Sequence, residues 1–168
     1  PAMIKGLYDF LDTREVHNNF TLGIVDDVTN LSVKYDKTFR IPSNNIEFLI
    51  YGFGSDGMVS ASKDIMKITG TYTNAYVQGY FQYDSKKSGG VTISNLRFGK
   101  KKIRSTYYVE KASLIVCTKD SYLKRLKMLE KIKNKGVFVL NTTKTPDEVL
   151  ASMSVHDKKI LQDRNIKM

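Results

Sequence analysis

The chain has 168 residues, of which 41% are apolar and 26% are charged, a composition typical of a folded domain that excludes the low-hydrophobicity class of disordered proteins. No stretch approaches the ~18 consecutive apolar residues of a membrane-spanning helix, so no membrane partner is expected. The net charge of +10 favours phosphate-bearing or acidic partners, or it reflects lysine-rich faces exposed to solvent.

Residues 1–43 contain no helix of convincing length, and only residues 20–25 alternate in the manner of a short strand. We expect 1–43 to be a lead-in from a preceding domain that packs on the core, and 44–168 to be the domain proper. Because the chain does not begin with Met and residues 166–168 resemble the start of a strand, we expect a piece of a longer polypeptide, truncated at its C-terminal end.

The domain is expected to begin with a buried strand over Glu47 to Tyr51. A glycine turn follows this strand. Apolar residues then recur at helical spacing from Met58 until Gly70, which is a plausible C-terminal cap. The order is strand, glycine turn and helix.

Four further strands are predicted over 76–82, 91–98, 113–117 and 137–140, and 103–109 is predicted to pair with 91–98 across the turn at Gly99-Lys100. Tyr122, Leu126, Leu129 and Ile132 predict a helix that Gly136 ends, with a basic, solvated outer face.

Thr145 and Ser154 each begin a helix, because both are followed three residues later by an acidic residue. Helices alternate with strands along the chain, which favours a three-layer α/β, Rossmann-like domain with a mostly parallel or mixed sheet.

The glycine turn matches the dinucleotide fingerprint G-x-G-x-x-G in its required context, between a strand and a helix. Its candidate cofactor-binding residues are Gly52, Gly54, Ser55, Asp56 and Gly57. Asp56 would oppose a pyrophosphate unless it turns away to cap the helix, and Asp84 lies farther along than the usual ribose ligand. A stand-alone NAD- or FAD-binding domain is therefore the alternative, and tight strand-to-helix packing also explains the glycines.

Cys117 is the only cysteine, and His17 and His156 are the only histidines. These residues cannot form an internal disulfide or supply a zinc or iron–sulfur ligand set, so no metal site and no catalytic residue is assigned to the chain. Cys117 is expected in the core and both histidines at the surface. A reducing cytoplasm fits this cysteine usage.

Several longer motifs carry a family resemblance. They are YGFGSDG at 51–57, QGYFQYDSKKSGGVT at 78–92, LRF at 96–98 and IRSTY at 103–107. Together they closely resemble the gamma-type, internal domain of pyruvate:ferredoxin/flavodoxin oxidoreductases, over about residues 18–168.

The resemblance implies a parent enzyme that oxidatively decarboxylates pyruvate to acetyl-coenzyme A. Such a parent uses thiamine diphosphate with Mg, carries [4Fe-4S] clusters, takes coenzyme A as a substrate and passes electrons to ferredoxin or flavodoxin. It is implied to be a homodimer whose other domains hold the thiamine diphosphate. The thiamine-binding motif is absent from this chain, so the chain alone is expected to be inactive.

The loop around Lys86 and Lys87 combines two cations with glycines, which suits a phosphate. The resemblance suggests that this loop binds coenzyme A phosphates, and the alternative is a contact with another domain of the parent. The loop's candidate residues are Lys86, Lys87, Ser88, Gly89 and Gly90.

Arg97 and Arg104 belong to the same resemblance and are candidate phosphate or carboxylate ligands, although arginines on strands more often form structural ion pairs. A nucleic-acid partner is not expected, because the basic residues are dispersed and no aromatic stacking motif accompanies them.

Overall fold

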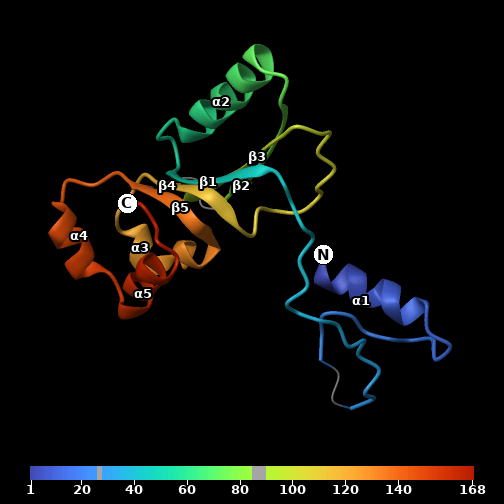
Figure 1. Ribbon diagram of the computed structural model, residues 1–168. Helices are drawn as coiled ribbons and strands as arrows, with labels where there is room; N and C mark the ends of the chain where they lie inside the picture. The colour runs from blue at the N-terminus through green and yellow to red at the C-terminus, as the bar shows by residue number, and fades with distance from the viewer. Residues whose placement is uncertain (26–27, 85–89) are drawn as a thin grey trace. The chain divides into compact units, whose positions relative to one another are not determined.

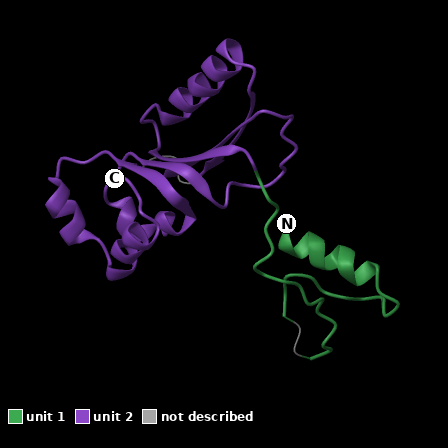
Figure 2. Cartoon of the chain, in the orientation of Figure 1, with its two compact units in different colours: residues 1–43 green, residues 44–168 purple. Residues whose placement is uncertain are grey.

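The computed structural model describes residues 1–25, 28–84 and 90–168. The chain forms two compact units, residues 1–43 and residues 44–168 (Figure 2). Each unit is described by itself.

The first unit contains a helix that the sequence analysis missed, α1 at Ala2–Leu11. Gly6 in its middle lowers helix propensity by about 1 kcal/mol relative to alanine. Its lack of a side chain is used for packing, because an added Cβ would collide with the side chain of Tyr35. The predicted strand at 20–25 is wrong as well, since Thr21 forms only an isolated bridge with Ser32.

The second unit is built on one five-stranded sheet with the order β2-β3-β1-β4-β5. β1 pairs in parallel with β4, and β4 with β5, while β3 lies antiparallel between β1 and β2. The predicted mixed sheet is confirmed. The strands are β1 Ile46–Phe53, β2 Tyr76–Tyr83, β3 Val91–Gly99, β4 Ala112–Cys117 and β5 Ile132–Leu140.

Helices cover both faces of this sheet (Figure 1). α2 lies on one face, and α3, α4 and α5 lie on the other, so the three-layer α/β architecture is confirmed. The helices of this unit are α2 Met58–Tyr72, α3 Tyr122–Arg125, the 3-10 helix η1 Met128–Lys131, α4 Pro146–Ser152 and α5 Val155–Asp163.

The alternation of side chains along each strand divides the core between the two faces. Leu49, Ile115 and Phe138 are at most 1% exposed and belong to the larger core cluster, which α3, α4 and α5 complete. On the opposite face, Ile50 and Leu96 pack with residues of α2. The two predicted N-terminal caps are confirmed, because Thr145 forms a capping box with Glu148 and Ser154 accepts a hydrogen bond from the Asp157 N–H.

The predicted strand at 103–109 is wrong, because β3 already has β1 and β2 on its two edges. The segment instead crosses the face of the sheet and is held by side chains. Gln78 donates to the Ser105 carbonyl at 2.8 Å, and Asn95 accepts from the Val109 N–H at 3.0 Å.

The long helix predicted from Tyr122 to Gly136 is wrong. The chain forms only α3 and η1 before β5 begins at Ile132, which pairs with Ala112. Gly136 lies inside β5 at an irregular point of the strand, where an added Cβ would lie 2.6 Å from the Ile132 side chain. The prediction for Gly70 is also wrong, since α2 continues through it to Tyr72.

Candidate functional site

The glycine turn joins β1 to α2 and is closed by the Asp56 carboxylate. This carboxylate accepts hydrogen bonds from the Phe53 N–H at 2.6 Å and from the Met58 N–H at 2.9 Å. Thr118, which follows β4, donates its hydroxyl to the same carboxylate at 2.8 Å. Asp56 thus satisfies a donor of the first turn of α2 that a bound anion would otherwise use.

Gly52 and Gly57 each have a structural reason to be glycine. An added Cβ at Gly52 would lie 2.7 Å from the Thr92 hydroxyl and 3.0 Å from the Met58 Cβ. Gly57 has a φ of +82°, which side-chain-bearing residues rarely adopt. Ser55 adopts a φ of +73° in the same turn. Packing against Thr92 and Met58 therefore accounts for Gly52, and the left-handed backbone accounts for Gly57, without reference to a ligand.

The residues on either side of the predicted lysine loop lie next to this turn, at the ends of β2 and β3. Gly54 donates its N–H to the Gly90 carbonyl at 2.9 Å, and the Asp84 N–H donates to the Val91 carbonyl at 3.1 Å. Asp84 and Gly90 therefore lie where β2 and β3 end and begin, beside the turn. The candidate residues Lys86, Lys87, Ser88 and Gly89 fall in 85–89, outside the described residues.

A hollow of about 520 Å³ lies between the turn and these flanks. Its lining comes from the turn at 53–57, the first turn of α2, and the ends of β2 and β3 next to segment 85–89. We take this hollow as the candidate functional site. Of the predicted site residues, the structure brings Gly54, Ser55, Asp56, Gly57 and Gly90 together there.

Arg97 does not lie in this hollow. It is five residues beyond Thr92 on β3, roughly 17 Å along an extended strand. Its guanidinium is 1% exposed, with Nε 3.0 Å from Glu47 Oε1 and Nη1 3.1 Å from Gln78 Oε1. The ring of Tyr107 stacks on it at 5.0 Å.

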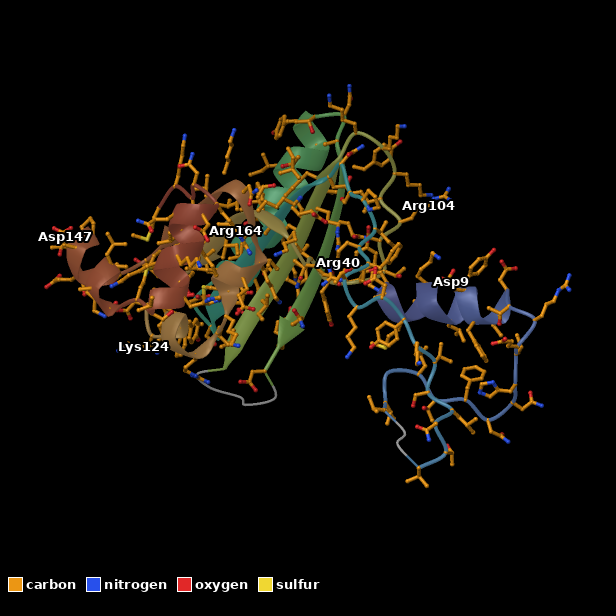
Figure 3. All side chains as sticks on the ribbon, turned by 60° about the horizontal axis from the view of Figure 1, so that its bottom comes forward. Asp9, Arg40, Arg104, Lys124, Asp147 and Arg164 are labelled. Carbon is orange, nitrogen blue, oxygen red and sulfur yellow. The ribbon has the colours of Figure 1, made fainter. Side chains whose placement is uncertain are left out.

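Arg104 is exposed in the segment after β3 (Figure 3), and it is not among the residues that line the hollow. Neither arginine is therefore brought together with the glycine turn, and a ligand role for either one stays a prediction.

Sequence reasoning missed three residues on the other side of Asp56. Thr118, Lys119 and Asn141 line a second hollow of about 300 Å³. Thr118 and Lys119 follow β4, and Asn141 follows β5. Because carboxyl ends of parallel strands share one edge of a sheet, where α/β folds bind ligands, their positions directly after two predicted strands were the available signal.

Lys119 places its ammonium 4.3 Å from the centroid of the Phe53 ring, so this cation lies at the glycine turn. A cation over an aromatic face is attracted by the ring quadrupole. The turn thus has two charged groups. One is the Asp56 carboxylate, which is already hydrogen-bonded within the turn, and the other is the exposed ammonium of Lys119.

Burial raises the pKa of two core groups beneath the turn. The pKa of the Tyr51 hydroxyl rises to about 12, chiefly through desolvation, and that of the Cys117 thiol rises to about 11 for the same reason. Cys117 is fully buried. A thiol with a raised pKa is a poor nucleophile at neutral pH.

Among the residues that the structure describes, no group of three or more His, Cys, Asp or Glu side chains is placed to hold a metal ion. Across 1–25, 28–84 and 90–168, no helix is both long and apolar enough to cross a membrane.

Comparison with protein families matches residues 47–167 to the model described as pyruvate ferredoxin/flavodoxin oxidoreductase. The pyruvate-flavodoxin oxidoreductase of Trichormus variabilis is 43% identical over 169 residues, which cover all of this chain and 14% of that protein. The chain thus spans about a seventh of the length of such a relative.

Two solved structures share the fold. The pyruvate oxidoreductase subunit PORC from Thermotoga maritima superposes with a TM-score of 0.55 at 20% identity, covering 66% of this chain and 57% of that one. A 2-oxoglutarate:ferredoxin oxidoreductase from Magnetococcus marinus, solved with 2-oxoglutarate, coenzyme A and succinyl-CoA bound, gives a TM-score of 0.51 at 18% identity. That match covers 64% of this chain and 18% of the other.

Proposed function

This chain belongs to the pyruvate ferredoxin/flavodoxin oxidoreductase family, and we propose that it acts as a non-catalytic domain of a larger enzyme of that kind. In this proposal the parent oxidises pyruvate to acetyl-coenzyme A and reduces ferredoxin or flavodoxin. The chain contributes to coenzyme A binding and to packing between domains.

The observation that carries the proposal is the pattern of coverage. The match to a pyruvate-flavodoxin oxidoreductase runs along the whole chain at 43% identity but occupies only 14% of that relative. A segment of this size is one domain. The reaction itself, with its thiamine diphosphate, Mg and iron–sulfur clusters, is therefore assigned to the rest of the parent.

Support for coenzyme A binding comes from where the lysine-bearing segment is attached. Asp84 and Gly90 flank Lys86 and Lys87 in sequence, and both line the hollow at the glycine turn. Ammonium groups suit the phosphates of coenzyme A, because charge-assisted hydrogen bonds are about twice as strong as neutral ones.

The rival reading, a stand-alone dinucleotide-binding domain, loses support from the same geometry. Asp56 takes the Met58 N–H, and β3 separates β1 from β2. Asp84, at the end of β2, is therefore two strand spacings or ~10 Å from the end of β1, whereas the fingerprint expects the acidic residue on the neighbouring strand.

The proposal is tested by steady-state kinetics on the intact parent carrying Lys86→Ala and Lys87→Ala. We expect the Michaelis constant for coenzyme A to rise by about two orders of magnitude, since two charge-assisted contacts of ~1.5 kcal/mol or more each are lost. The constant for pyruvate should stay within about twofold, because the lost contacts concern the other substrate.

The matched control is Lys100→Ala with Lys101→Ala, which removes the same charge from an exposed pair just beyond the far end of β3. This control should leave both constants unchanged. An unaltered coenzyme A constant in the Lys86/Lys87 variant, together with a lowered melting temperature, would instead make these lysines contacts to another domain.

A further inference from the structure

Within the described residues of the second unit, part of one face of the sheet is left uncovered. Two cross-strand rows run over this face, namely Phe48–Leu114–Val137 and Ile50–Val116–Val139. In each row the residues come from the adjacent parallel strands β1, β4 and β5. All six side chains are apolar.

In each row the residue on β5 is the most exposed. Ile50 is 2% exposed, whereas Val137 and Val139 are 38% and 46% exposed. The alternate residues of β5 behave differently, since Phe138 on the opposite face is 1% exposed. We call Leu114, Val116, Val137 and Val139 the β4–β5 strip.

The strip lies beside α2 and is not covered by it. α2 packs on β1, β2 and β3, and α3, α4 and α5 lie on the other face of the sheet (Figure 1). Parallel strands occur almost only where both faces are covered, because their residues are apolar on both sides. The half-buried Leu114 and Val116 on β4 and the exposed Val137 and Val139 on β5 depart from that rule within the described residues.

The strip has the dimensions of one helix. Two strands and their margins span about 10 Å, which matches the ~10 Å diameter of an α-helix. Lys167 pairs with Val137 at the outer edge of β5, so its exposed side chain borders the strip on the same face.

We propose that a helix of the longer polypeptide, from outside these 168 residues, packs on the β4–β5 strip beside α2. Its contact stripe is apolar, and it carries an acidic residue opposite Lys167. This inference rests on the proposed function, because a relative that matches the whole chain is about seven times longer. That extra length supplies the helix.

Hydroxyl-radical footprinting, read by mass spectrometry, tests the proposal on the 168-residue chain and on the longer protein. Oxidation of Val137 and Val139 should be about fivefold slower in the longer protein, since side chains that are 38% and 46% exposed would join a buried contact. Equal oxidation rates in the two proteins would overturn the proposal.

The variant Val137→Thr with Val139→Thr adds two hydroxyls to the contact while keeping side-chain shape. In the longer protein it should raise the oxidation rate of Leu114 and Val116 at least about twofold, because buried hydroxyls without partners are costly. The control Val155→Thr changes a valine on α5, on the opposite side of the sheet, and should have no effect on Leu114 or Val116. An equal effect of both variants would contradict the assignment to the strip.

Sedimentation of the 168-residue chain tests whether a second copy of the chain covers the strip instead. A dimer that the double threonine variant dissociates would show that another copy covers the strip, and would overturn the proposal. The footprint needs no activity measurement. It therefore stands or falls independently of coenzyme A binding at Lys86 and Lys87.

Discussion

Arg97 and Glu47 show how single residues of this domain serve the fold. The Glu47 carboxylate lies between Arg97 Nε and Lys133 Nζ, 3.0 Å from each. Arg97 Nη1 donates to Gln78 and the Tyr107 ring lies against the guanidinium, while Nη2 is buried without a hydrogen-bond partner among the described residues. Because Gln78 also holds the Ser105 carbonyl, this network fastens segment 100–111 to the sheet.

Replacing Arg97 by methionine should lower the free energy of unfolding by about 3 kcal/mol, because it leaves a buried carboxylate with one cation fewer. Urea denaturation followed by circular dichroism measures this change. The more exposed pair of Lys144 and Asp120 is the control, and Lys144→Met should change the free energy of unfolding far less than the Arg97 variant does. Similar losses in both variants would contradict a structural role specific to Arg97.

The buried hydroxyl of Tyr51 predicts a loss of stability at alkaline pH. Its pKa rises from 10.0 to about 12 on folding, and that of Cys117 rises from 9.0 to about 11. The folded chain therefore keeps these protons while the unfolded chain releases them. The associated stability is fully present below about pH 9 and is lost as the pH rises toward 12.

Each two-unit shift corresponds to on the order of 3 kcal/mol. The urea midpoint should fall steadily from pH 8 to pH 10 and pH 11, and the fall should be shallower in Tyr51→Phe. Lysine titration affects both proteins equally, so the difference between their profiles reports Tyr51 alone. Parallel pH profiles for the wild type and the variant would refute the contribution of Tyr51.

Among the elements, the glycine turn shows that a dinucleotide motif can also meet the needs of strand-to-helix packing. The sequence satisfies G-x-G-x-x-G, yet Gly52 is required by contact with Thr92 and Met58, and Gly57 by its positive φ. The Asp56 carboxylate occupies the place where an anion would meet the Met58 N–H.

Calorimetric titration of the 168-residue chain with NAD and with FAD should therefore show no saturable binding. A micromolar dissociation constant, about −8 kcal/mol, would restore the dinucleotide reading.

Strands were easier to predict from this sequence than helices. The runs at 47–51, 76–82 and 113–117 are apolar or alternating over a whole strand, and each forms one. Tyr122, Leu126 and Leu129 also recur at helical spacing, but they do not form one helix. Tyr122 belongs to α3 and Leu129 to η1, Leu126 lies between these two elements, and all three precede β5. Periodicity could not reveal that Ile132 pairs with Ala112, because this contact depends on residues distant in sequence.

The candidate site was predictable where it depends on one turn and not where it depends on the sheet. The glycine turn and Asp56 were identified from their order along the chain. Lys119 and Asn141 were missed, because only the parallel pairing of β1, β4 and β5 brings the ends of these strands to the same edge. Arg97 matched the family motif, but its burial beside Glu47 depends on the register of β1 and β3.

At the scale of the whole molecule, the second unit combines a closed core with a sheet face that remains partly exposed within the described residues. Its core is closed around Leu49, Ile115 and Phe138, while Val137 and Val139 remain exposed. A closed core together with exposed apolar residues is typical of a domain in a larger protein, because such a domain folds around its own core and also contacts neighbouring domains. The net charge of +10 favours acidic neighbours and phosphates.

We propose that this chain is a non-catalytic domain of a pyruvate oxidoreductase, and reduction of a viologen dye with pyruvate and coenzyme A tests this role most directly. The longer protein that contains this sequence should reduce the dye only when both substrates are present. The 168-residue chain, folded by circular dichroism, should not reduce it at all. Dye reduction by the chain alone would contradict the non-catalytic role. Failure of the longer protein to oxidise pyruvate would contradict the proposed parent enzyme.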